Sequence, residues 1–203
     1  MRAELEARAG GNVSSNVGVN YILQLLRSRE LAEVRALYAQ AGLNLLSDLA
    51  TLNRAQRITA DPAAVNYLQK YIVFNGQLRI PVLTMHTTGD GLVQVQQEQA
   101  YASTVRSAGN ADLLRQVFAH RAGHCAFTPA ETITAFQTLV RRLDSGAWDN
   151  VADVQALNNA ASALGPSYNV YLSGAGATPA APAFLRYQPN AFLRPYDYRS
   201  SSR

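Results

Sequence analysis

Residues 12–76 place their apolar side chains three and four positions apart, which predicts helices. The first helix follows a capping residue, Ser15 or Asn16. The second ends near Gly42, where a helix end favours a left-handed residue, and the third opens at Asp61-Pro62, a cap with proline in the first turn. The apolar faces are Tyr21, Ile22, Leu25 and Leu26, then Leu31, Val34, Leu37, Tyr38 and Ala41, then Val65, Leu68 and Ile72.

The pattern changes after residue 77. Leu78 to His86 is an almost unbroken apolar run, which is typical of a strand buried on both faces of a parallel sheet. Val93 to Arg106 favours a helix, and Leu113 to Ala119 is a second apolar run. Strand, helix and strand in this order predict one βαβ unit with a right-handed crossover.

Two more helices and a tail complete the chain. Thr128-Pro129-Ala130-Glu131 is a capping box that opens a helix ending before Gly146, and a further helix is predicted from about Asn150 to Leu164. From Pro166 onward Pro, Gly, Ala and Ser predominate, so we expect an extended tail held through its aromatic side chains. The apolar positions of these parts are Ile133, Phe136, Leu139, Val140 and Leu143, then Val151, Val154, Leu157, Ala161 and Leu164, and the tail aromatics Phe184, Tyr187, Phe192, Tyr196 and Tyr198.

Composition narrows the possible partners. The 203 residues carry a formal charge of +4, Lys70 is the only lysine, and the arginines are scattered. A nucleic-acid surface usually shows a clustered basic stripe with interleaved aromatics, so no nucleic-acid partner is expected. No apolar run approaches the roughly 20 residues that span a bilayer, so no membrane span is expected. The single Cys125 forms no internal disulfide, and the localisation of the protein stays open.

An acid and a histidine follow the two predicted strands. Asp90 lies in Thr87-Thr88-Gly89-Asp90-Gly91-Leu92-Val93, and His124 lies in Arg121-Ala122-Gly123-His124-Cys125-Ala126-Phe127. Reactive groups of parallel sheets collect in the loops at the carboxyl ends of the strands. A catalytic histidine needs one free ring nitrogen and an acceptor for the other. The sequence therefore predicts that Asp90 orients His124.

These two loops resemble the α/β-hydrolase family, in which the acid also precedes the histidine. The acid loop matches from Pro81-Val82-Leu83 through Gly89-Asp90 to Leu92-Val93, and the histidine loop matches at Gly123-His124, Phe127 and the helix that follows. The resemblance is specific from about Arg79 to Leu143. It implies an α/β fold and, within it, the C-terminal part of a hydrolase. Residues 1–76 would be a helical cap-like segment, 77–148 the βαβα part of the core, and 149–203 a C-terminal helix and tail.

The same resemblance implies a small-molecule ester or amide substrate that is hydrolysed through an acyl-enzyme, without a cofactor. His124 would act as base and then as acid, and Asp90 would hold it. The candidate substrate-pocket residues are Tyr21, Leu25, Tyr67, Tyr71 and His86. The family's serine turn, Gly-x-Ser-x-Gly between a strand and a helix, is absent from these residues, so the chain alone is expected to be inactive.

Two apolar parallel strands cannot form a stable sheet alone, because they leave edge groups unpaired and apolar faces uncovered. The sequence thus predicts missing strands, supplied by an upstream segment or by another chain. We interpret the chain as the C-terminal portion of a longer serine hydrolase. The alternative is a non-catalytic binding protein that keeps part of a hydrolase scaffold.

Each of the chemically active residues also has a simpler interpretation. Asp90 alone is an ordinary turn residue, and His124 alone an ordinary loop histidine; the pair in this order indicates function. Cys125 is not favoured as the nucleophile, because adjacent residues project in different directions and its thiol would not easily reach His124. Metal binding by His86, His120, Asp90 and His124 is not favoured, since the stretch before His120 is predicted as a strand and Gly123 breaks a helical spacing between His120 and His124.

Overall fold

The computed structural model describes residues 2–148, 153–173 and 176–193. The chain divides into two compact units, one from Met1–Val73 with Leu193–Arg203 and one from Phe74–Phe192. We call the first the helical unit and the second the sheet unit, and describe each by itself.

The helical unit begins its helices at polar caps. Asn20 caps the helix that starts at Tyr21, because its side-chain oxygen accepts the N–H of Leu23 at 3.1 Å. The expected cap at Ser15 or Asn16 is wrong, since Asn16 instead accepts the N–H of Ile58 at 2.6 Å. Asp61 caps its helix as predicted, with Pro62 in the first turn. The helices are α1 (Arg2–Ala9), α2 (Tyr21–Arg27), α3 (Leu31–Gln40), α4 (Leu45–Arg54) and α5 (Pro62–Tyr71).

The helical unit buries few of its apolar side chains. Neither α2 nor α3 has a buried residue, and α4 buries only Leu49. The predicted faces are helical, but Leu26, Leu37 and Ile72 on them are exposed. A cavity of about 550 Å³ lies among α2, α3 and α4 and is lined by Ile22, Leu25, Leu26, Leu31, Arg35, Gly42, Leu43, Asn44, Leu45, Leu46 and Leu49.

The sheet unit contains the predicted strand–helix–strand order, and its two long strands are parallel. The first strand starts at Val82 and not at Leu78, because Pro81 has no N–H to donate to a ladder. The elements are β1 (Val82–Gly89), α6 (Gln96–Ser107), the short 3₁₀ helix η1 (Ala111–Leu113), β2 (Leu114–Ala122), α7 (Pro129–Ser145), α8 (Val154–Ala163), β3 (Val170–Ser173), β4 (Gly176–Pro179) and β5 (Phe184–Leu185).

The sheet is mixed, which differs from the purely parallel pair expected. In the strand order β1-β2-β5, β5 pairs antiparallel with β2, with Phe118 opposite Leu185 and Ala119 opposite Phe184. The chain's own tail therefore covers part of the edge of β2. Among the described residues, no strand pairs with the outer edge of β1.

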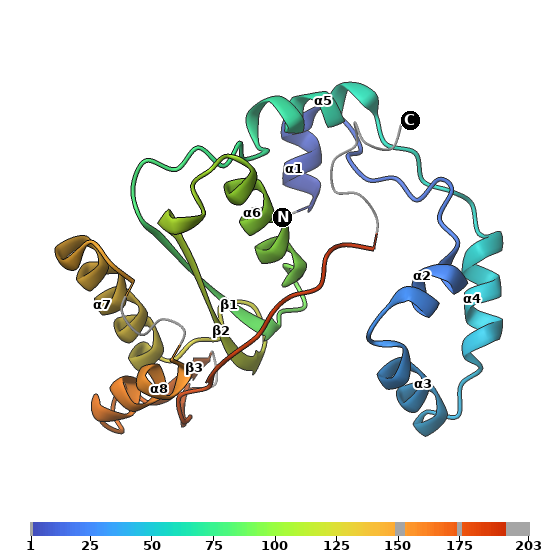
Figure 1. Cartoon of the computed structure of the whole chain (residues 1–203). Helices are drawn as coiled ribbons and strands as arrows, with labels where there is room; N and C mark the ends of the chain where they lie inside the picture. The colour runs from blue at the N-terminus through green and yellow to red at the C-terminus, as the bar shows by residue number, and fades with distance from the viewer. Residues whose placement is uncertain (1, 149–152, 174–175, 194–203) are drawn as a thin grey trace. The chain divides into compact units, whose positions relative to one another are not determined.

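Helices cover both sides of this sheet. Figure 1 shows α6 on one side of β1 and β2, and α7 with α8 on the other. Thr128 and Glu131 form the predicted capping box of α7, which ends at Gly146 in the left-handed conformation. The core between the strands, α7 and α8 consists of Val117, Ala130, Ala135, Leu157, Ala161 and Phe184.

The apolar positions of α7 do not all face this core. Its buried residues are small or polar, namely Ala130, Glu131, Thr134, Ala135 and Thr138. Phe136 is 66% exposed, and Val140 and Leu143 are also exposed. The expectation that β1 is buried on both faces is wrong as well, since Thr87 is its only fully buried residue. The described part of the chain thus leaves an apolar helix face and a strand edge without a cover.

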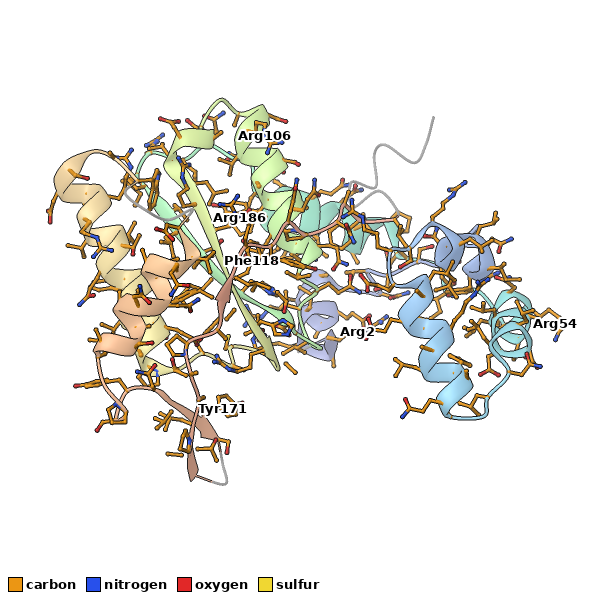
Figure 2. All side chains as sticks on the ribbon, turned by 60° about the horizontal axis from the view of Figure 1, so that its bottom comes forward. Arg2, Arg54, Arg106, Phe118, Tyr171 and Arg186 are labelled. Carbon is orange, nitrogen blue, oxygen red and sulfur yellow. The ribbon has the colours of Figure 1, made fainter. Side chains whose placement is uncertain are left out.

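The tail is more structured than expected. The strands β3 and β4 form an antiparallel hairpin, on which Figure 2 labels Tyr171, while Phe118 lies on the central strand β2. Phe184 is buried, and the ring of Tyr187 packs against that of Phe118 with centroids 5.4 Å apart. The predicted positions Asn150, Val151, Tyr196 and Tyr198 lie outside the described residues. No helix in the described ranges combines the length and apolarity needed to cross a bilayer.

Candidate active site

Asp90 and His124 are in contact at the carboxyl ends of the two parallel strands. Nδ1 of His124 lies 2.8 Å from Oδ2 of Asp90. The Asp90 side chain is only 4% exposed, whereas that of His124 is 42% exposed. The carboxylate is therefore enclosed, and the imidazole lies between it and the solvent.

The environment of Asp90 keeps the carboxylate ionised. Burial by itself raises its pKa, but this effect is outweighed by hydrogen bonds from the N–H of Val93, from the His124 side chain and from the N–H of Leu92, and by the attraction of His124. Together they lower the pKa of Asp90 to about 2. The two backbone amides donate to Oδ1, at 2.9 Å from Val93 and 2.8 Å from Leu92, which leaves Oδ2 for His124.

The ionised carboxylate determines the tautomer of His124. A carboxylate without a proton can only accept hydrogen bonds, so Nδ1 of His124 carries the proton in this contact. In the neutral imidazole, Nε2 then carries a lone pair. This is the state that a general base requires, with the imidazolium stabilised by Asp90 once Nε2 takes up a proton.

The two loops are joined by contacts beside the Asp90–His124 pair. The buried hydroxyl of Thr87 donates to the carbonyl of Gly123 at 2.6 Å, and the N–H of Gly123 donates to the carbonyl of Gly89 at 3.0 Å. A Cβ at Gly89 would stand 3.1 Å from Cα of Ala122, so glycine permits this close approach. Thr87 was not anticipated as a site residue; its position before Gly89 was the only signal for it.

Cys125 reaches His124, contrary to the expectation from sequence. Its Sγ lies 3.5 Å from Nε2 of His124. The backbone of Cys125 has φ 52°, a left-handed conformation that a non-glycine residue rarely adopts. This turn redirects the side chain toward the imidazole, which the argument from neighbouring residues on an ordinary backbone could not foresee.

The predicted substrate-pocket residues do not form one cluster. Leu25 lines the cavity of the helical unit, whereas Tyr21, Tyr67 and Tyr71 are not among its lining residues. Tyr67 and Tyr71 pack against each other on α5, with ring centroids 5.0 Å apart and ring planes tilted by 51°. In the sheet unit, His86 directs Nδ1 to the carbonyl of Thr87 at 2.8 Å. Across the described ranges, no group of three or more His, Cys, Asp or Glu side chains is placed to hold a metal ion.

One curated relative shares part of its sequence with the chain. A protein of Xanthobacter agilis named o-phthalyl amidase is 34% identical over 134 residues. The match covers 64% of this chain and only 29% of that protein, so the chain corresponds to less than a third of the relative's length. No family model matches the chain, and no solved structure matches it.

Proposed function

We propose that the chain supplies the acid and the base of a hydrolase that cleaves a small-molecule amide or ester through an acyl-enzyme. The 2.8 Å contact between Asp90 and His124 carries the proposal, because it pairs a carboxylate that is 4% exposed with an imidazole that is 42% exposed and is bonded to the carboxylate through Nδ1. The relative named o-phthalyl amidase supports hydrolysis in general and favours amides as the substrate class.

In the proposed reaction, Nε2 of His124 takes the proton of a nucleophile as the nucleophile attacks the carbonyl carbon. Asp90 stabilises the imidazolium that results. Nε2 then gives this proton to the leaving nitrogen or oxygen as its bond to carbon breaks. Water attacks the acyl-enzyme with His124 again as base, which releases the carboxylic acid and restores the nucleophile.

The nucleophile in this proposal is a serine outside the chain, in an arrangement of the α/β-hydrolase type. Two features of the sheet unit support a further part that completes the sheet. The outer edge of β1 has no partner strand in the described ranges, and Phe136 and Leu143 on α7 are exposed. A free strand edge and an apolar helix face are surfaces that proteins usually cover. The relative, of which this chain matches 29%, has ample additional length for such a part.

The test is labelling by a fluorophosphonate, which reacts with an activated serine, together with amine release from an o-phthalyl amide. Both are measured on the complete native protein that contains these residues. We expect His124→Ala to abolish labelling, and Asp90→Asn to lower the hydrolysis rate by about 10⁴-fold. His120→Ala is the matched control, since His120 is an exposed histidine four residues away on β2.

The outcome separates catalysis from binding. A folded native protein that is neither labelled nor able to hydrolyse the amide would refute the hydrolase and favour a scaffold that only binds. Equal loss of labelling in His120→Ala and His124→Ala would also count against the proposal, because it would indicate damage to β2 rather than removal of a base.

The contact between Cys125 Sγ and His124 Nε2 favours a second candidate, in which the nucleophile is a thiol within the chain. Cys125 is exposed, so the thiol is open to reagents. A thiol hydrolase would lose activity after treatment with iodoacetamide and in Cys125→Ala. The serine hydrolase proposed first would keep its activity in Cys125→Ala, so this variant distinguishes the two candidates.

A further inference from the structure

Arg121 and Glu131 form an ion pair at the two ends of the segment that carries His124. The Glu131 side chain is fully buried and that of Arg121 is 16% exposed. The contact is bidentate, with Nη1 donating to Oε2 at 2.6 Å and Nη2 donating to Oε1 at 3.0 Å. Burying two charges is costly unless their remaining hydrogen-bonding groups are also satisfied.

Backbone groups satisfy the rest of the pair. Glu131 accepts the N–H of Thr128 at 2.8 Å and the N–H of Ala183 at 2.8 Å. Arg121 donates to the carbonyl of Ala126 at 2.8 Å and to that of Ala181 at 3.1 Å. The pair is therefore bonded on one side to the histidine loop and on the other to the segment just before β5.

These contacts restrict the backbone around His124. Gly123 is held by Thr87, and Ala126 is held by Arg121, so both sides of the His124–Cys125 dipeptide are fixed. Cys125 keeps its left-handed φ of 52° within this span. A strained conformation of this kind persists only where the surrounding contacts determine it.

We propose that the Arg121–Glu131 pair positions His124 against Asp90, and that residues 181–183 complete the pair by occupying its remaining donors and acceptors. The catalytic meaning of this inference rests on the proposed hydrolase, whereas the positioning itself is measurable without activity. Arg121 and Glu131 are positioning residues, since their contacts are to backbone and to each other and not to the imidazole.

The main test replaces both charges together, as Arg121→Met/Glu131→Gln. Glutamine serves in a capping box, so the N–H of Thr128 keeps an acceptor, and no unpaired charge remains buried. The readout is the proton NMR resonance of the His124 Nδ1–H, which we expect to exchange slowly with water while it is hydrogen-bonded to the enclosed Asp90 carboxylate. We expect this resonance to broaden and disappear while circular dichroism still shows a folded chain. In the complete native protein, we expect kcat to fall by about 100-fold with little change in KM.

Val105→Ala is the control for a purely structural effect, because Val105 is fully buried in α6, outside the Asp90 and His124 loops, and its apolar side chain forms no hydrogen bond. It should lower stability and leave the His124 resonance in place. Arg121→Lys keeps the charge but loses the bidentate contact with Glu131, so the Nδ1–H of His124 should exchange with water faster than in the unmodified chain. This milder variant decides the matter if the double variant does not fold.

A folded double variant or Arg121→Lys with an unchanged His124 resonance would overturn the positioning role. Ala183→Pro removes one N–H that Glu131 accepts but keeps the Ala183 carbonyl for the N–H of His120, which it accepts at 2.7 Å. Unchanged proton exchange in that variant would remove residues 181–183 from the proposal. If the unmodified native protein has no hydrolase activity but the double variant loses the resonance, the positioning role is supported and the hydrolase is rejected. If the unmodified protein is active but the double variant keeps the resonance, the hydrolase is supported and the positioning role is rejected.

Discussion

The two units of the molecule bury their large apolar side chains to different extents. In the sheet unit, Val117, Leu157 and Phe184 are buried in one cluster between the strands, α7 and α8. In the helical unit, α2 and α3 bury no residue, and Leu46 of α4 is 68% exposed. Both units have clear helical periodicity in sequence, so periodicity alone does not decide burial. Burial depends on whether another element is present to receive the apolar face.

Because of this difference, side chains are held in fixed positions in the sheet unit, whereas the helical unit presents apolar side chains to solvent. The sheet unit holds Asp90 and His124 with a core, two strand ends and a buried ion pair. The helical unit instead contains an open pocket of about 550 Å³ that is lined mostly by leucines. Elements with few buried apolar contacts open at low free energy, so we expect faster amide exchange in α2 and α3 than in β2. The following predictions test this contrast, beginning with the largest effect.

Loss of the Glu131 carboxylate should give the largest effect. Glu131→Ala leaves the Arg121 charge largely buried without its partner, so we expect the sheet unit to lose about 3–5 kcal/mol of unfolding free energy. Glu4→Ala is the matched change in the helical unit, because the Glu4–Arg8 pair is exposed on both sides and contributes about 0–1 kcal/mol. Urea unfolding followed by circular dichroism measures both. Similar shifts for the two variants would refute the contrast between the units.

The second-largest difference is expected between two leucine truncations, one in each unit. Leu157→Ala opens a cavity in the core of the sheet unit, where Leu157 is 4% exposed, and should cost about 2–5 kcal/mol. Leu46→Ala removes a side chain that is already in contact with solvent, and should change stability by no more than about 0.5 kcal/mol. Thermal unfolding of the two variants tests this. A large loss in Leu46→Ala would mean that an occupant covers Leu46 in solution.

The features that the sequence predicted follow from local residue patterns or from the topology of one strand–helix–strand unit. The capping box of Thr128 and Glu131 and the cap at Asp61 each depend on residues three positions apart or fewer. The contact between Asp90 and His124 was also anticipated, because parallel strands bring their carboxyl ends to the same edge of a sheet. In the first two cases a few neighbouring residues determine the outcome, and in the third the parallel pairing of β1 with β2 does.

The features that were missed depend on distant partners or on one unusual backbone angle. Strand β5 has two residues, too short for any alternation, and its pairing with β2 joins residues that are far apart in sequence. The contact of Cys125 with His124 depends on the left-handed φ of Cys125. Phe136 is exposed because no element in the described residues packs over that side of α7. No pattern within either segment contains this information.

Protonation of Asp90 at acid pH should lower the unfolding free energy by an intermediate amount. Its pKa is lowered from 3.8 to about 2 in the folded chain, so the folded state binds fewer protons than the unfolded state between these values. The stabilisation is complete above pH about 4 and is lost as the pH falls toward about 2. It amounts to at most about 2 kcal/mol, and to less where solvent screens the contact with His124.

Asp90→Asn isolates this contribution. The difference in unfolding free energy between the unmodified chain and Asp90→Asn should shrink as the pH falls from about 4 to about 2. Urea unfolding at a series of pH values measures it. A difference that does not change across this range would show that Asp90 is not held as an ionised carboxylate.

The smallest effect tests what stabilises the helical unit in the absence of a large core. The carboxylate of Asp61 accepts the N–H groups of Ala63 and Ala64 at 2.8 and 3.4 Å, and so satisfies donors at the start of α5. Asp61→Ala should cost about 1 kcal/mol, whereas Asp61→Asn should cost little, because asparagine is an equally good cap. Amide exchange of α5 measures both. Leu46→Ala is expected to lose less unfolding free energy than Asp61→Ala, because the cap at Asp61 contributes more to this unit than an exposed leucine does. A larger loss in Leu46→Ala than in Asp61→Ala would show that leucine packing dominates in the helical unit as well.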